Sequence, residues 1–170
     1  MDKKLEQLLA EVQLTQGALV KFDQRLGFMI VPEEEVHQAL VVAQRLMQVA
    51  GMRVHPLYDK IPLVVTRATG GESDADLAGS RGSYYRGMIR LAEGAGFDTL
   101  VHECVHHLQG AAILSALDPW FGLQRDRTPY RHRWYEQEAF MIQKAFLMGL
   151  SPTHWAIRLW NWNQKRKWDK

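Results

Sequence analysis

The stretch HECVHHLQ, residues 102–109, restricts the local fold more than any other part of this sequence. His102 and His106 are four residues apart, so on an α-helix they project from one face, about 40° apart in azimuth and about 6 Å apart along the axis. Two imidazoles in that arrangement can bind one metal ion. The motif therefore predicts a helix at this point, with a further ligand supplied from elsewhere in the chain.

Glu103 directly follows His102, where its carboxylate can reach a metal-bound water without taking a ligand position. A glutamate in that place can act as the general base of a hydrolytic reaction, so the pattern indicates a zinc centre that activates water. Catalytic zinc takes three protein ligands and leaves its fourth position to water. The segment YEQEAF, residues 135–140, offers the carboxylates of Glu136 and Glu138 as third ligand.

The residues around the motif have helical periodicity. After Gly96 the chain reads FDTLVHECVHHLQGAAILSAL, with Asp98 as the expected N-cap and apolar residues spaced for burial. This pattern predicts a helix over 97–116. The motif would then lie on a buried helix that follows a strand, as a metal-dependent hydrolase requires.

Two short apolar segments before this helix predict strands. IPLVVT, residues 61–66, is rich in valine and is bounded by a polar, glycine-rich loop. GMIRLAEG, residues 87–94, alternates in polarity, which is typical of a strand with one buried face. We expect the second strand to lie at a sheet edge, where an extended substrate can pair with it. Residues 67–86 are expected to form an irregular loop.

The remaining elements are predicted to be helices. Pro32, followed by three glutamates, begins one that Gly51 ends. The others are expected at 2–16, from a cap at Thr128 and Pro129 to Gly149, and at about 153–166.

These elements predict a mostly helical α+β fold, in which a small sheet packs on the helix that carries the motif. A chain of 170 residues with 46% hydrophobic residues has the size of one domain. We therefore treat 1–170 as a single domain, with N-terminal helices in 1–50, a catalytic core over about 61–148, and a C-terminal helix and basic tail in 151–170.

The two motifs resemble those of the gluzincin branch of the HExxH zincin metallopeptidases. The pattern is similar to that of small bacterial and phage proteins classed as metallopeptidases, with HExxHxxQ followed by ExEA. The resemblance covers about residues 61–148 and implies a minimal zincin-like domain, a Zn²⁺ cofactor and a polypeptide substrate. Gluzincins with an ExxAD arrangement bind zinc through the first glutamate, which implies that Glu136 completes the site with His102 and His106.

The chain departs from that arrangement at Phe140, where the family has an aspartate that supports a zinc-bound histidine. Glu138 or a backbone carbonyl is expected to give that support instead. Glu138 thus remains a candidate for indirect support of the metal, or for the third ligand itself.

The neighbours of the motif have simpler interpretations. His107 lies about 100° around the helix from His106, so we expect it to meet solvent or a loop. Cys104 is expected in the core, and Gln109 in a hydrogen-bond network. Three further residues are candidate donors to a transition-state oxyanion, and the sequence does not choose among them: Tyr130, His132 and His154.

The charge and apolar patterns argue against several other classes of protein. The net charge of +2 gives no strong nucleic-acid signal. No window approaches the roughly 18 apolar residues of a transmembrane segment, and the N-terminus lacks the pattern of a signal peptide. The single cysteine favours a reducing compartment. We expect a cytoplasmic protein without an export signal of its own, with release by lysis or within a particle left open. No pattern indicates an oligomeric state.

Three functional hypotheses follow. The first is a zinc metallopeptidase with Glu103 as general base. The second is a non-catalytic zinc-binding structural or interaction protein, for example a phage or mobile-element component. The third is a helical module that uses the basic tail at 163–170, beside a tryptophan-rich helix, to bind nucleic acid or a membrane surface. A helix packed on the core with a solvated end is the simpler interpretation of that tail.

Overall fold

The computed structural model describes residues 28–55, 61–67, 81–85, 87–92, 95–110 and 133–168. The described elements are, in chain order, β1 (Phe28–Ile30), α2 (Glu33–Val49), β2 (Leu63–Arg67), β3 (Gly82–Tyr85), β4 (Met88–Ala92), α3 (Phe97–Leu108), α6 (Trp134–Met148) and α7 (Trp155–Trp168). The helices have 12 to 17 residues and the strands 3 to 5. The predicted α+β class is confirmed. The helix expected over 2–16 and the cap at Thr128 and Pro129 lie outside the described residues.

The described strands form one mixed sheet in the order β1-β2-β4-β3. β2 and β4 are parallel, and the two outer strands are antiparallel to their neighbours. The prediction that the strand at 87–93 lies at an edge is wrong, because Ile89 pairs with Val64 on one side and Tyr84 on the other. β3 occupies that position, in a segment expected to be loop. Its tyrosines favour an extended chain, and Gly87, with φ 82°, permits the turn into β4.

The apolar face of α2 forms one side of the core. Pro32 is the N-cap and not the first residue of the helix, so α2 begins one residue later than predicted. Gly51, with φ 71°, follows the end of the helix. Three glutamates in its first turn suit the positive end of the helix dipole. Its buried residues have helical spacing: Val36, Ala39, Val42, Ala43, Leu46 and Met47.

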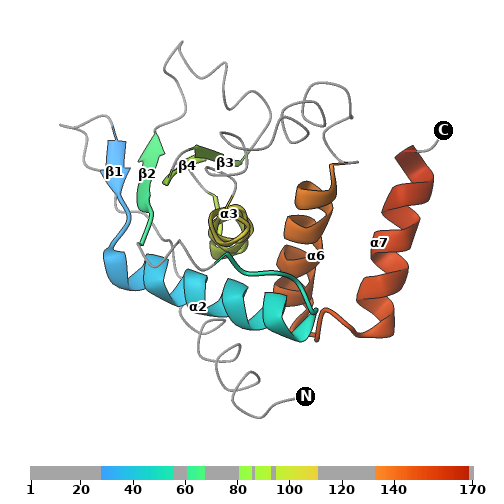
Figure 1. Ribbon diagram of the computed structural model, residues 1–170. Coiled ribbons are helices and arrows are strands. Elements are labelled where there is room, and N and C mark those ends of the chain that lie inside the picture. Colours follow the sequence, from blue (N-terminus) through green and yellow to red (C-terminus); the bar gives the residue numbers. More distant parts are fainter. Residues whose placement is uncertain are drawn as a thin grey trace.

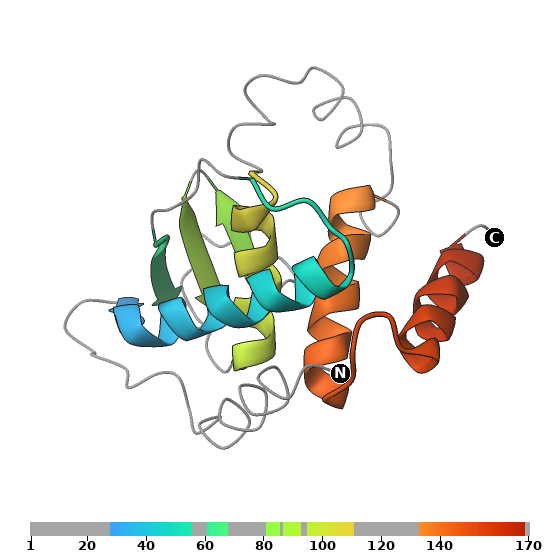
Figure 2. The ribbon, with the colours of Figure 1, turned by 60° about the horizontal axis from the view of Figure 1, so that its bottom comes forward.

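The helix that carries the motif, α3, is the centre of the molecule. It lies between the sheet and α6 (Figure 1), and α2 crosses it (Figure 2). Every residue from 99 to 110 is buried, because α3 packs against α2, α6, β3 and β4 at once. The sheet thus packs on the motif helix, as predicted.

Both ends of α3 differ from the prediction. Gly96 is the N-cap, and as a glycine it has no side chain that could cap the helix. Asp98, the expected cap, lies in the first turn, where its carboxylate accepts a hydrogen bond from Gln143. The helix ends at Leu108, eight residues early. Gly110, with φ 70°, adopts a left-handed conformation that ends a helix.

The last two helices form an antiparallel pair at the side of the core (Figure 1). Gly149, with φ 61°, ends α6 as expected. α7 packs against α6. Ile157 of α7 is fully buried in the core, and Nζ of Lys144 on α6 lies 5.5 Å from the ring centroid of Trp160 on α7. Within the described ranges, each helix is too short or too polar to cross a bilayer.

Candidate metal centre

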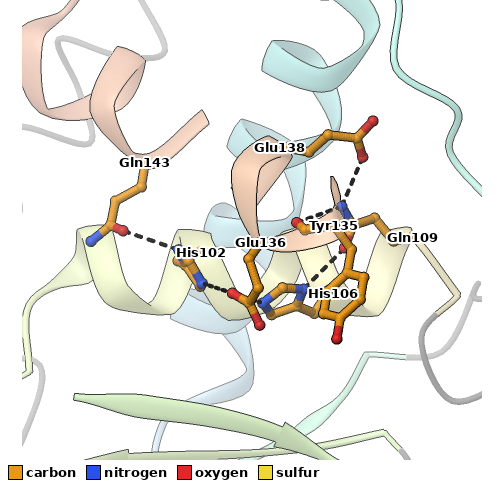
Figure 3. Close-up of polar contacts among 7 residues, drawn as sticks. All are labelled: His102, His106, Gln109, Tyr135, Glu136, Glu138 and Gln143. Atoms are coloured by element: carbon orange, nitrogen blue, oxygen red, sulfur yellow. Dashed lines mark hydrogen bonds and ion pairs between the residues drawn. The ribbon is translucent and has the colours of Figure 1, made fainter. Parts of the chain in front are cut away.

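Three polar side chains converge where α3 meets α6 (Figure 3). Nε2 of His102 lies 3.3 Å from Oε2 of Glu136, and Nε2 of His106 lies 3.2 Å from the same oxygen. The three atoms that can act as ligands all lie within 4.8 Å of one another. The structure therefore brings together the two histidines of the motif and the first of the two candidate glutamates.

The geometry of this buried His-His-Glu group fits a metal ion. The three residues are only 4%, 6% and 5% exposed. Oε2 of Glu136 is buried and has no hydrogen-bond partner, although both imidazole nitrogens point toward it. A tetrahedral metal ion with bonds of about 2.0–2.1 Å holds its ligand atoms about 3.3 Å apart. Two of the three separations already match this value, so the group could hold a metal ion.

The outer nitrogen of His102 is held from α6. Nδ1 of His102 donates to Oε1 of Gln143 at 3.0 Å. Nε2 of Gln143 in turn donates to Oδ2 of Asp98 at 2.7 Å. The imidazole is thereby fixed with Nε2 directed at Glu136 (Figure 3).

The outer nitrogen of His106 is held in the same way by Gln109. Nδ1 of His106 donates to Oε1 of Gln109 at 3.0 Å. The amide of Gln109 donates to the carbonyl of Tyr135 at 3.0 Å and to Oε2 of Glu138 at 2.8 Å. Gln109 thus lies in a hydrogen-bond network, as expected. Glu138 supports a ligand histidine indirectly and lies outside the ligand group.

Phe140 stands where the resemblance to gluzincins led us to look for an aspartate, and it packs on a histidine instead. The ring of Phe140 packs on His102, with centroids 4.7 Å apart. Glu138 and a backbone carbonyl were expected to replace the aspartate. Both accept hydrogen bonds from Gln109, which contacts His106, whereas His102 is held by Gln143. Gln143 was missed in the sequence. The available signal was its spacing of seven residues, about two turns, from Glu136.

The electrostatics of the group are those of a buried ion pair. Burial alone would lower the pKa of His106, but the charges of Glu136 and Glu103 raise it to about 9. Burial would raise the pKa of Glu136, and His106 and His102 instead hold it well below its usual value. Without a metal ion, an ionised carboxylate therefore faces a protonated imidazole.

Glu103 lies beside this group without being part of it. Its side chain is 4% exposed and approaches Gly82 of β3, where a Cβ atom would lie 2.8 Å from Oε1 of Glu103. The same Cβ would lie 2.9 Å from Cγ2 of Thr99. Burial raises the pKa of Glu103, and His106 and His102 oppose that shift. The carboxyl group is thus held near the ligands with an increased affinity for a proton.

The other two residues of the motif lie in the interior. The expectation that His107 meets solvent or a loop is wrong, because the residue is 1% exposed and its Nδ1 lies 3.2 Å from the hydroxyl of Tyr84 on β3. β3 was not predicted, so its contact with this face of α3 was not anticipated. Cys104 is fully buried in the core, as expected.

Of the three candidate oxyanion donors, only His154 lies among the described residues, and it is not near the group. Tyr130 and His132 lie outside the described residues. His154 follows the C-terminus of α6, whereas Glu136 lies near its N-terminus, and the helix between Glu136 and Met148 is about 18 Å long. Nδ1 of His154 accepts a hydrogen bond from the backbone of Ala156.

Comparisons with protein-family models, curated proteins and solved structures found no match to this chain. A buried group of two histidines and one glutamate could bind a metal ion.

Proposed function

We propose that this protein is a zinc-dependent hydrolase, and specifically a metallopeptidase of the gluzincin type. One observation carries the proposal: a separate buried carboxyl group, that of Glu103, lies beside a converging set of three ligand side chains. Three protein ligands leave a fourth tetrahedral position for water, as in catalytic rather than structural zinc sites. Among the described residues, no fourth histidine, cysteine or carboxylate joins the set.

The ligand chemistry favours zinc. Two neutral imidazole nitrogens and one carboxylate oxygen are typical zinc ligands, and the same donors in a tetrahedral arrangement suit Mg²⁺ and Ca²⁺ poorly. When bound, zinc would polarise a carbonyl and lower the pKa of a water molecule.

In this proposal, Glu103 accepts a proton from the attacking water. Its raised pKa suits that role, because a general base works best when its pKa lies near the working pH. Its position directly after His102 keeps the carboxylate near the ligands and out of their set. His102, His106 and Glu136 hold the metal, and the two glutamines hold the histidines.

A polypeptide is the proposed substrate class, on the strength of the two motifs. HExxHxxQ and ExEA resemble those of metallopeptidases, and the folded chain places the histidines of the first motif opposite the glutamate of the second.

The burial of the group favours a second candidate function, a structural zinc site in a non-catalytic protein. All three ligand residues and Glu103 are 4% to 6% exposed. A catalytic site requires access for substrate, whereas a structural site is closed. Under this alternative the metal would join α3 to α6, and Glu103 would have no chemical role.

Hydrolysis of an unfolded polypeptide separates the two functions. The zinc-loaded protein, the chelated protein and Glu103→Gln are each incubated with labelled casein, and the released peptides are quantified. A peptidase loses about 10²–10⁴-fold in rate with Glu103→Gln, while its zinc content and melting temperature stay unchanged. Chelation should abolish activity and added zinc should restore it. If the parent protein and Glu103→Gln both bind zinc and neither cleaves casein, the result supports the structural site.

A further inference from the structure

We propose that Gln143 and Gln109 are amide relays through which Asp98 and Glu138 determine the tautomer of the two ligand histidines. In each relay a carboxylate orients an amide, and the amide orients an imidazole. These four residues are positioning residues, since none of them belongs to the ligand set. The inference rests on the proposed function only where it concerns zinc affinity.

The two ends of a glutamine amide differ in their hydrogen bonding. Its oxygen only accepts hydrogen bonds and its nitrogen only donates them, and a 180° rotation exchanges the two. A glutamine beside a histidine can therefore bond either imidazole tautomer. An ionised carboxylate has no such freedom, because it only accepts.

At His102 the carboxylate of Asp98 removes this ambiguity. Oδ2 of Asp98 lies 2.7 Å from Nε2 of Gln143, so the nitrogen end of the amide must face Asp98. Oε1 of Gln143 must then face His102, at 3.0 Å, and Nδ1 of the imidazole must carry the proton. Nε2 is left with its lone pair directed toward Glu136, which is the form that a metal ion requires.

At His106 the relay has two acceptors instead of one. Nε2 of Gln109 donates to the carboxylate of Glu138 and to the carbonyl of Tyr135. Either acceptor alone keeps the nitrogen end of the amide away from His106. The orientation of Gln109 is therefore redundantly fixed, whereas the orientation of Gln143 depends on Asp98 among the described hydrogen bonds.

This asymmetry gives the relays a distinctive mutational signature. Asp98→Asn can donate as well as accept, so Gln143 can rotate and stabilise the wrong tautomer of His102. We expect zinc affinity to fall about 10-fold, at the lower end of the loss typical for residues behind metal ligands. Glu138→Gln should have a smaller effect, because the carbonyl of Tyr135 still fixes Gln109. Glu34→Gln, on the exposed start of α2, serves as the control.

The experiment has two measurements. Zinc affinity is measured by competition with a chromogenic chelator. The tautomer of His102 is measured in metal-free protein by ¹⁵N NMR of the imidazole nitrogens, at a pH where the ring is neutral. We expect Nδ1–H in the parent and a mixture of tautomers in Asp98→Asn. A loss of packing without a relay would leave the tautomer unchanged.

Gln143→Met provides a second test if Asp98→Asn does not fold, since it retains side-chain length and removes both ends of the amide. It should lower zinc affinity and remove the preference for Nδ1–H at His102. The proposal is overturned if both variants keep the parental tautomer, or if Glu138→Gln weakens zinc binding more than Asp98→Asn. Because the NMR measurement needs no metal, it tests the relay even if the parent binds no zinc, a result that would instead end the proposed function.

Discussion

Nε2 of His106 lies 3.2 Å from Oε2 of Glu136, yet this oxygen has no hydrogen-bond partner and is buried between α3 and α6. Buried charges are paired or bind metals, and this carboxylate can be balanced either by a protonated imidazole or by a metal ion. The second imidazole, that of His102, faces the same oxygen at 3.3 Å. This convergence of ligand atoms is the basis of the proposed metal site.

The two candidate glutamates should differ in their effect on metal binding. Glu136→Gln removes a ligand, so zinc affinity should fall by more than the roughly 10–100-fold that loss of an indirect support costs. Glu138→Gln removes one of two acceptors for Gln109 and should cost less. Competition with a chelator measures both affinities. A larger loss in Glu138→Gln would mean that the third ligand has been assigned to the wrong residue.

Zinc binding should release a proton from His106. The raised pKa, about 9, means that the metal-free protein holds this proton at pH 7, while Glu136 is already ionised. Zinc requires the neutral imidazole, so its affinity should rise about tenfold per pH unit until pH reaches about 9. Calorimetry in two buffers of different ionisation enthalpy counts the protons. Binding without proton release at pH 7 would contradict the ion pair.

The same shift has a consequence for the stability of the metal-free protein. Because folding raises the pKa of His106, its protonation contributes stability that is fully present below about pH 6.5. That contribution is lost as the pH rises through about 9. In the zinc-loaded protein His106 is already neutral, so the loss over this range should be smaller. Denaturant unfolding across this range compares the two states.

Gly82 should be required for the placement of Glu103. Alanine there would bring its Cβ within 2.8 Å of Oε1 of Glu103, so one of the two must shift. Displacement of a catalytic group by about 1 Å can cost about 10²-fold in rate. Gly82→Ala should therefore lose hydrolysis and keep its zinc, and Ser83→Ala on the same strand should keep both. Full activity in Gly82→Ala would show that Glu103 needs no exact position.

Zinc should also stabilise the fold, because its ligands come from two helices. Free zinc at about 100 times its dissociation constant adds about 2.7 kcal/mol. For a protein of this size that corresponds to a rise of about 5–10 °C in melting temperature. Calorimetry with and without chelator measures the shift, and Glu136→Gln should reduce it strongly. An equal shift in that variant would mean that zinc binds elsewhere.

The two histidines of the group could be predicted from local spacing, whereas Glu136 was predicted from the resemblance of the second motif to that of gluzincins. The positions of His102 and His106 on one helix face follow from the geometry of any α-helix, and the second motif narrowed the third ligand to two residues. The supports of the histidines could not be predicted in the same way. The spacing of seven residues from Glu136 puts Gln143 on the same face of α6, but its contact with His102 depends on how α3 and α6 pack, which this spacing alone does not reveal.

The incorrect predictions about the fold have a similar physical origin. β3 contains Gly82 and follows a glycine-rich segment, so its local pattern favoured a loop. Its pairing with β4 gives this short segment its strand conformation, and the same pairing moves β4 from the edge to the interior of the sheet. The burial of His107 was missed for the same reason, because β3 brings Tyr84 against this residue. Strand pairing and the packing of β3 on α3 determined each of these features, whereas periodicity was sufficient to locate α2, α3 and α6, although not both ends of α3.

Metal analysis tests the central claim most directly. Protein purified without added zinc is measured by inductively coupled plasma mass spectrometry, alongside Glu136→Gln prepared in the same way. We predict one zinc ion per chain in the parent, and much less in the variant, because His102, His106 and Glu136 are proposed to supply all its protein ligands. A parent that holds no zinc and takes none up, or a variant that holds as much as the parent, would contradict the account.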